Sequence, residues 1–165
     1  MQIIQERPED VAIIGALTDA AFKGAPYSSQ TEAKIVDALR AGGALTLSLI
    51  AVQDGEIVGH AAFSPVRIDG RAGGWQGLGP VSVWPDRQRT GVGSAIIHDG
   101  LDRLRAMKAH GCVVLGDPGY YGRFGFRSDP ALRYGDVPAR YFQGLPFTGG
   151  MPAGEVTYHP GFDAG

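Results

Sequence analysis

Apolar and polar positions along the chain follow two periods, and the changes between them predict the order of elements. An alternation with a period of two, or a short apolar run, predicts strands. These are expected over residues 2–5, 45–52, 56–68, 74–85, 112–116 and 155–160. Apolar residues at helical spacing predict helices, which are expected from Pro8, from Ser29, over residues 91–109 and over PGYYGRF. This order of elements indicates a mixed α/β fold.

Local signals refine the boundaries of these elements. The dipeptides Asp54-Gly55 and Asp69-Gly70 each predict a tight hairpin turn. Ser29 and Glu32 have the spacing of a capping box, so the second helix is expected to begin at Ser29. The dipeptide Gly79-Pro80 predicts an interruption of the strand over 74–85, because proline has no N–H to donate.

Length and composition fit one globular domain over residues 1–165. The chain is 44% hydrophobic and 19% charged, and no repeat or linker divides it. We expect a core over residues 1–130. A C-terminal tail with one strand is expected over 131–165, where glycine and proline are frequent and periodicity is weak.

Charge and cysteine content exclude several classes. The net charge of −2 and the pI of about 6.0 provide no basic surface for nucleic acid. The single cysteine, Cys112, forms no disulfide within the chain, and no apolar run approaches the roughly 20 residues of a membrane span. The histidines lack metal-ligand spacing, so no metal site is expected. The expectation is a cytoplasmic protein without a membrane association.

The segment PDRQRTGVGSAIIHDGLDRL, residues 85–104, places Gly91 and Gly93 at the start of a helix. Glycine there costs about 1 kcal/mol each against alanine, so the pair indicates close approach of a ligand. A helix N-terminus binds anions, which points to a phosphate or pyrophosphate. A P-loop would need a lysine that this segment lacks, and a dinucleotide fingerprint would need glycine or alanine at Ile96.

A third interpretation fits these residues better. Gln88-x-x-Gly91-x-Gly93 follows the strand VSVWP in VSVWPDRQRTGVGSAII, and GYYGRFGF comes later in the chain. Together these motifs resemble the GNAT superfamily of N-acetyltransferases over roughly residues 1–130, and VLGDPGYYGRFGF resembles its YhbS-like branch. The resemblance implies a central, mostly antiparallel sheet flanked by helices and splayed between the fourth and fifth main strands. It also implies acetyl-CoA as cosubstrate.

The resemblance assigns roles residue by residue. The pantetheine arm is expected along the strand before the loop, and the pyrophosphate on the loop and helix start. The expected cofactor-binding residues are Val81, Ser82, Val83, Gln88, Arg89, Thr90, Gly91, Val92, Gly93 and Ser94. Tyr121 matches the family tyrosine that protonates the departing thiolate. Many relatives carry an asparagine before this tyrosine, whereas residues 114–118 here read VLGDP.

The general base stays open. Glu32 and Asp117 are candidates, although Glu32 also fits a capping box and Asp117 also fits a cap of the helix at Pro118. His60 and Asp86 are further candidates. Cys112, at the start of an apolar strand, is explained as a small apolar core residue.

The function expected from the resemblance is direct acetyl transfer from acetyl-CoA to a primary amine of a small molecule or protein, with a homodimer as one allowed state. A protein of the same fold that binds CoA as a sensor or interaction module is the alternative. A nucleotide-phosphate binder is a third reading, and it would bind ATP as well as CoA.

Overall fold

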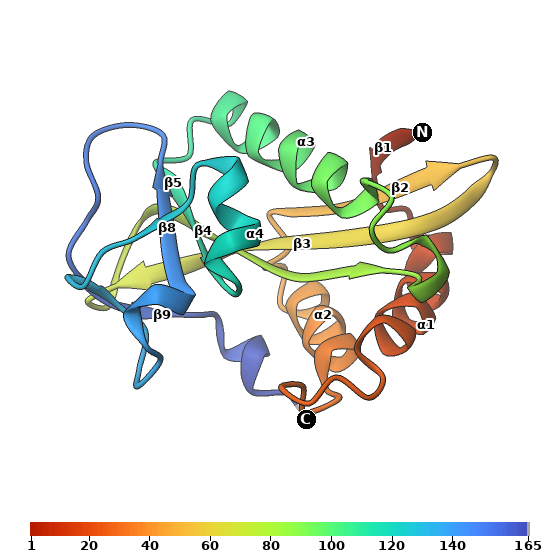
Figure 1. Cartoon of the computed structure of the whole chain (residues 1–165), viewed down its shortest axis with the longest axis horizontal. Coiled ribbons are helices and arrows are strands. Elements are labelled where there is room, and N and C mark those ends of the chain that lie inside the picture. Colours follow the sequence, from red (N-terminus) through yellow and green to blue (C-terminus); the bar gives the residue numbers. More distant parts are fainter. Residues whose placement is uncertain (165) are drawn as a thin grey trace. The chain divides into compact units, whose positions relative to one another are not determined.

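The computed structural model describes residues 1–164 (Figure 1). These residues divide into two compact units. Unit 1 comprises residues 1–63, 79–100 and 160–164. Unit 2 comprises residues 64–78 and 101–159. The prediction of a single domain over residues 1–165 stays a prediction.

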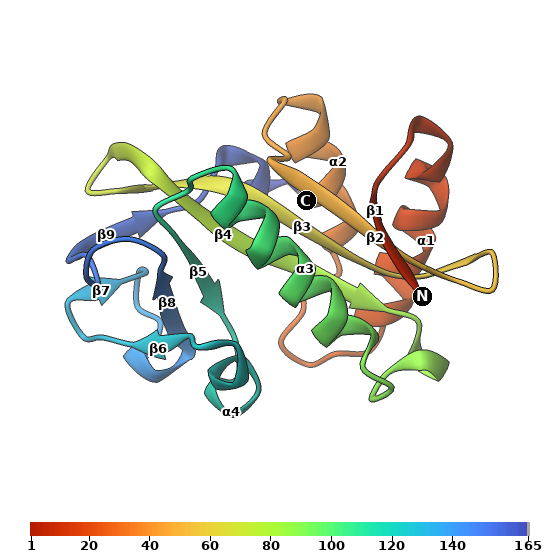
Figure 2. The same ribbon diagram turned by 90° about the horizontal axis from the view of Figure 1, so that it is seen from above.

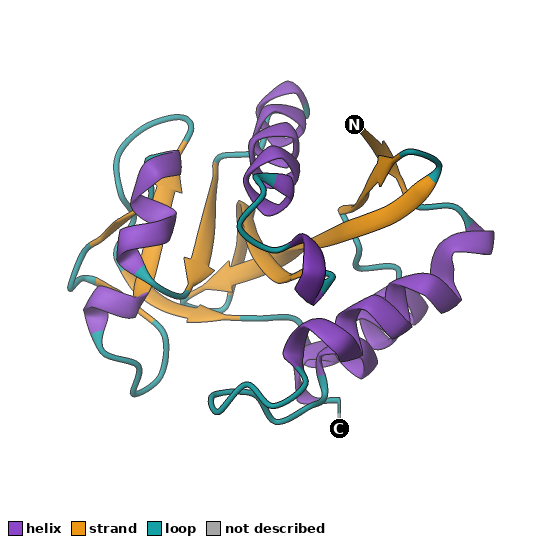
Figure 3. Ribbon diagram, turned by 45° about the vertical axis from the view of Figure 1, so that its right-hand side comes forward, coloured by secondary structure: helices purple, strands orange, loops and turns teal. Residues whose placement is uncertain are grey.

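Unit 1 contains a sheet with helices on both faces. Its strands are β1 (Gln2–Gln5), β2 (Leu47–Gln53), the first part of β3 (Glu56–Ile68) and the last part of β4 (Arg71–Val83). Its helices are η1 (Pro8–Asp10), α1 (Val11–Phe22), α2 (Glu32–Ala41), η2 (Pro85–Arg87), the first part of α3 (Val92–Ala106) and η5 (Pro160–Asp163). The strand order is β1-β2-β3-β4, with α1 and α2 on one face and α3 on the other (Figures 1 and 3).

The hairpin between β2 and β3 shows why this unit folds as it does. Asp54 and Gly55 both have positive φ, 52° and 78°, and Gln53 pairs with Glu56, as in a two-residue hairpin turn. This turn brings the apolar face of β2 and β3 together. Ile50 of β2 packs with Ile14 of α1 and Val36 of α2, and all three are at most 1% exposed.

Unit 2 contains the remaining parts of β3, β4 and α3 and the later strands. These strands are β5 (Gly111–Leu115), β6 (Arg127–Ser128), β7 (Leu132–Arg133), β8 (Phe142–Pro146) and β9 (Gly154–Thr157). Its short helices are α4 (Pro118–Tyr121), η3 (Gly122–Phe124) and η4 (Ala139–Tyr141). β8 lies between β5 and β6, antiparallel to both (Figure 2). Its core cluster comprises Val66, Trp75, Val113, Leu132, Phe142 and Val156.

The predicted mixed sheet flanked by helices is confirmed. β5 runs parallel to β4, whereas β1–β2, β2–β3, β3–β9, β5–β8 and β6–β8 are antiparallel. The pairing of β4 with β5 ends at Leu78 and Val114, immediately before Gly79-Pro80. Pro80 has no N–H for a ladder, which gives the predicted end of pairing a local cause.

Some predicted boundaries are wrong. Ser29 does not cap α2; its hydroxyl lies 2.8 Å from Oγ1 of Thr31, and the carboxylate of Glu32 accepts the hydroxyl proton of Ser28. The helix begins at Glu32 because Gln30, with φ of 63°, turns the chain just before it. β4 is continuous through Gly79-Pro80 and begins at Arg71, not at residue 74.

The later part of the chain also departs from expectation. α3 ends at Ala106, since Lys108 has a left-handed φ of 63° and terminates the helix before residue 109. The tail over 131–165 holds more than the one expected strand. β8 lies in it and pairs with β5 along its whole length, although FQGLP carries no strand pattern.

Candidate functional site

The last residues of β4 expose backbone groups along one edge. The N–H of Trp84 donates to the carbonyl oxygen of Val58 on β3 at 3.2 Å. Because successive residues of an extended strand direct these groups to opposite edges, Val81 and Val83 direct theirs away from β3. No other strand of unit 1, among the described residues, pairs with that edge. The edge can therefore accept an extended ligand that carries amides.

Gln88 connects this edge to the loop that follows. Its Nε2 donates a hydrogen bond of 3.1 Å to the carbonyl oxygen of Val83, while its backbone has already left the strand. The hydroxyl of Thr90 donates to the carbonyl of Arg87 and closes the next turn. Both contacts fix the path of the loop between β4 and α3.

The loop ends at an open helix N-terminus. Arg89 and Gly91 have positive φ, 64° and 90°, and an added Cβ at Gly91 would meet open space. Gly91 is thus explained by its backbone conformation, not by crowding within the protein. The first helical hydrogen bond runs from the N–H of Ala95 to the carbonyl of Gly91 at 3.0 Å.

The consequence is a set of amides that precede the helical ladder. The N–H groups of Val92, Gly93 and Ser94 lie in the first turn, where the ladder leaves amides unpaired. The positive end of the helix dipole adds to their field, so the loop suits an anion such as a pyrophosphate. Unit 1 therefore holds all ten residues that sequence analysis expected to bind acetyl-CoA.

Tyr121 lies in unit 2 at the end of α4. Its ring makes edge contacts with Tyr120 and Phe126, at centroid distances of 5.0 and 6.0 Å. A Cβ added to Gly116 would lie 2.5 Å from Cε2 of Tyr121. Only glycine at 116 lets the ring lie against the backbone after β5, so Gly116 is a positioning residue for Tyr121. In the sequence, the position of Gly116 directly after the apolar run CVVL is the feature that could have identified this positioning residue.

The candidate general bases differ in their surroundings. Asp117 caps α4 as predicted, and its Oδ1 accepts from the N–H of Gly119 at 3.0 Å. The hydroxyl of Ser28 donates its proton to the carboxylate of Glu32, whose two oxygens lie 2.7 and 2.8 Å from Oγ. Asp86 is exposed in η2.

His60, by contrast, is fully buried. Its Nε2 lies 2.8 Å from Oγ of Ser48, which also bonds to the carboxylate of Glu6. Burial lowers the pKa of His60 to about 4, although the nearby charge of Glu6 opposes this shift. His60 is therefore neutral near pH 7 and belongs to a polar network inside unit 1.

Cys112 is buried in β5, and burial raises the pKa of its thiol well above the ordinary value. This agrees with its interpretation as a small apolar core residue. None of the helices in residues 1–164 combines the length and apolarity needed to cross a membrane.

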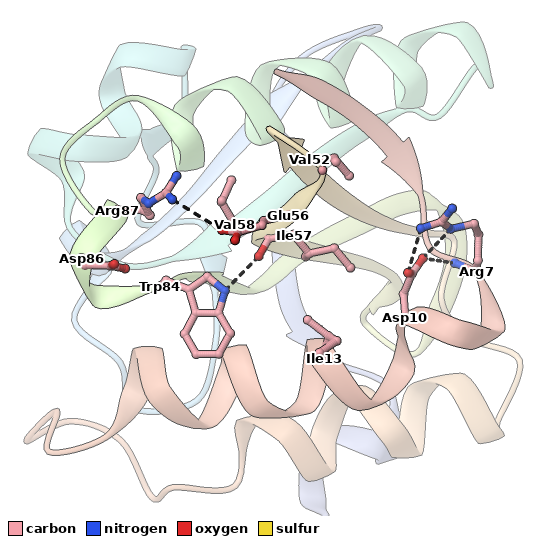
Figure 4. Close-up of a pocket in the computed structure, with 11 residues that line it drawn as sticks. Arg7, Asp10, Ile13, Val52, Glu56, Ile57, Val58, Trp84, Asp86 and Arg87 are labelled. Carbon is pink, nitrogen blue, oxygen red and sulfur yellow. Dashed lines mark hydrogen bonds and ion pairs between the residues drawn. The ribbon is translucent and has the colours of Figure 1, made fainter.

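A groove of about 620 Å³ in unit 1 was not predicted (Figure 4). It lies between the start of α1, the β2–β3 hairpin and the segment after β4. Its lining comprises Arg7, Asp10, Ile13, Val52, Gly55, Glu56, Ile57, Val58, Trp84, Asp86 and Arg87. Because these residues come from distant parts of the chain, no local pattern marks them.

Three comparisons with known proteins identify the family of this chain. A family model described as an acetyltransferase (GNAT) domain matches residues 2–128. The uncharacterized N-acetyltransferase YhbS of Escherichia coli K12 is 39% identical over 127 residues, which cover 76% of this chain and 73% of YhbS.

Solved structures give the same result. A GNAT family acetyltransferase from Brucella melitensis, solved in complex with acetyl-CoA, is 53% identical with a TM-score of 0.89 and covers 98% of this chain and 97% of its own. The structure of E. coli YhbS in complex with CoA is 35% identical, also with a TM-score of 0.89, covering 98% and 91%. The chain belongs to the GNAT acetyltransferase family.

Proposed function

We propose that this chain transfers the acetyl group of acetyl-CoA directly to a primary amine. The observation that carries the proposal is the open backbone of unit 1, where a free strand edge at Val81 and Val83 leads to the amides that begin α3. The 53% identical relative that is described in complex with acetyl-CoA supports the choice of cosubstrate.

The chemistry of acetyl-CoA matches these groups. Its pyrophosphate would bind at Gly91 to Ser94, since several N–H groups and the helix dipole favour a dianion there. Its pantetheine amides would pair with Val81 as an added strand does. The N–H of Val83 would donate to the thioester carbonyl and stabilise the charge that develops on its oxygen.

In the reaction, the lone pair of the amine attacks the thioester carbonyl carbon. The C–N bond forms and the C–S bond breaks as the tetrahedral intermediate collapses. A base takes the proton that the nitrogen loses, with Glu32 and Asp117 as candidates, and Tyr121 gives its phenolic proton to the CoA thiolate. The acceptor is a small molecule or a protein, and we propose a cytoplasmic enzyme that can form a homodimer.

A CoA-binding module without turnover is the second candidate. The observation that favours it is that Asp117 and Glu32 already accept hydrogen bonds from their own segments. The region before Tyr121 also lacks the asparagine of many relatives. Such a module would bind CoA through the same loop.

Calorimetric titration with acetyl-CoA, CoA and ATP tests the cofactor site first. Gly91→Glu places a carboxylate and a side chain at the anion site and should abolish CoA binding. Gly43→Glu is the matched control, because Gly43 also has positive φ, 65°, with open space at its Cβ. Absence of CoA binding overturns the proposal, and equal binding of ATP favours a nucleotide-phosphate site.

A screen of primary amines, with detection of the free CoA thiol, then tests turnover. For an accepted amine, Tyr121→Phe should lower kcat while the Kd for acetyl-CoA stays within about twofold. CoA binding without thiol release from any amine would favour the binding module.

A further inference from the structure

The groove in unit 1 has an apolar floor built around a fixed indole ring. Nε1 of Trp84 donates a hydrogen bond of 2.9 Å to the carbonyl oxygen of Ile57, which holds the ring in one orientation. The side chain of Ile13, a residue that is 45% exposed, lies with this ring between β3 and α1 (Figure 4). A ligand can therefore place a nonpolar body against Ile13, Ile57 and Trp84.

Most charges around the groove are paired with each other. Arg7 binds both carboxylate oxygens of Asp10, from Nε at 2.9 Å and Nη2 at 3.0 Å. A guanidinium nitrogen of Arg87 lies 3.6 Å from Oε2 of Glu56. These pairs leave Asp86, whose side chain has no hydrogen bond or ion pair with any residue of the described chain, 1–164.

The lining thus has one carboxylate in excess. It holds three carboxylates, at Asp10, Glu56 and Asp86, against two guanidinium groups, at Arg7 and Arg87. Asp86 lies two residues after Trp84 and is labelled beside it in Figure 4. A tryptophan face attracts cations more strongly than any other side-chain ring, so the ring and the carboxylate favour the same sign of charge.

We propose that this groove binds a small organic monocation, a protonated alkyl or aryl amine, with its nonpolar part against Ile13 and Ile57 and its ammonium group near Trp84 and Asp86. The volume of about 620 Å³ is in the usual range of small-molecule sites. Such an amine has two possible sources, the acceptor of the transferase reaction or a separate effector. The binding itself does not depend on acetyl-CoA.

The probe is n-hexylammonium, titrated into ¹⁵N-labelled full-length protein, with 1-hexanol and hexanoate as matched ligands. The chain has two tryptophans, and Trp75 lies in unit 2, 6% exposed. We expect a saturable shift of the Trp84 indole N–H resonance and no shift of the Trp75 resonance. The resonances are assigned with Trp84→Phe. Hexylammonium should bind at least threefold more tightly than hexanol, and hexanoate least tightly.

Asp86→Asn should raise the Kd for hexylammonium about threefold and leave that for hexanol unchanged. Asp54→Asn is the control for net charge, because Asp54 is exposed in the adjacent turn and asparagine tolerates its φ of 52°. Equal affinities for hexanol and hexylammonium, equal effects of the two variants, or no shift at 50 mM probe would each overturn the proposal.

Two further experiments distinguish an acceptor from an effector, and the amine-binding proposal from the proposed acetyl-CoA site. If the bound amine is the acceptor, Asp86→Asn raises the KM for an accepted amine; if it is an effector, binding weakens while KM stays constant. Gly91→Glu should leave hexylammonium binding intact. A failure of CoA binding would therefore leave the amine-binding proposal testable, and a failure of amine binding would leave the acetyl-CoA proposal testable.

Discussion

The carbonyl oxygen of Val83 accepts a hydrogen bond of 3.1 Å from the side-chain amide of Gln88. This contact joins the last residue of β4 to the loop that precedes α3. It uses the carbonyl of Val83 and leaves the N–H of the same residue at the free edge. The side chain of Gln88 therefore fixes the position of the free strand edge relative to the anion site of unit 1.

Gln88→Leu should therefore weaken acetyl-CoA binding without unfolding the protein. The leucine keeps the side-chain volume but removes a neutral hydrogen bond worth about 0.5–1.5 kcal/mol, which corresponds to a rise in Kd of roughly two- to tenfold. Calorimetry measures the Kd, and Gln2→Leu, at an exposed position of β1, is the control. Unchanged affinity in Gln88→Leu would show that the contact does not organise the site.

Gly116→Ala should displace the ring of Tyr121. The added Cβ would lie 2.5 Å from Cε2 of Tyr121, so the ring must move. We expect kcat to fall at least tenfold, with a smaller change in the KM for acetyl-CoA. Gly122→Ala, in the same segment, is the matched control, because its Cβ meets open space and its φ is −57°. Equal activity of both variants would exclude a role for the ring position.

Much of the fold follows from local signals in the sequence. The turn at Asp54-Gly55 was predictable because only a few residue types adopt left-handed φ readily, and both residues adopt it here. The sequence pattern explained Gly91 by close approach of a ligand, whereas the structure gives it a φ of 90°, which glycine adopts without strain. Where a few neighbouring residues determine the backbone conformation, the sequence pattern is sufficient to predict it.

The errors occur where distant residues decide the structure. β8 forms because Phe142–Pro146 pairs with β5, a strand about 30 residues earlier in the chain. The sequence FQGLP has no alternation of apolar and polar residues that would predict a strand. The groove combines residues near positions 10, 55 and 85. The cap of α2 was predicted at Ser29, two residues before the observed cap Thr31, because the left-handed Gln30, which donates its N–H to Oγ of Ser28, has an ordinary sequence context.

Gly100 of α3 tests the packing of unit 1. An added Cβ would overlap Cζ and Cε1 of Phe63, which is 0% exposed. Alanine favours a helix over glycine by about 1 kcal/mol, but overpacking costs about 1–3 kcal/mol. We expect Gly100→Ala to lower the free energy of unfolding by about 1 kcal/mol, measured by urea denaturation.

In the control variant, Gly15→Ala, the expected change in the free energy of unfolding has the opposite sign. Gly15 in the middle of α1 has nothing within 4 Å of an added Cβ, so Gly15→Ala should stabilise the protein by about 0.5–1 kcal/mol. Phe63→Leu should also reduce the cost of Gly100→Ala in the double variant, because leucine vacates the ring position. Destabilisation of the same size in Gly15→Ala would argue against the packing explanation.

His60 predicts a loss of stability in mild acid. Burial lowers its pKa from the ordinary 6.5 to about 4, so between these values the unfolded chain binds a proton that the folded protein does not. The free energy of unfolding is therefore highest above pH 6.5 and falls as the pH drops toward 4, by about 1 kcal/mol per pH unit at the steepest. Urea denaturation at half-unit steps from pH 7.5 to 5 measures this slope.

His60→Gln keeps an amide where Nε2 meets Ser48, but it cannot take a proton in this range. Its stability at pH 7.5 is expected to be lower, and its slope between pH 6.5 and 5 should be reduced by most of the wild-type value. The slope is a difference within one variant, so a general loss of stability does not affect it. An undiminished slope in His60→Gln would show that the acid sensitivity does not come from His60.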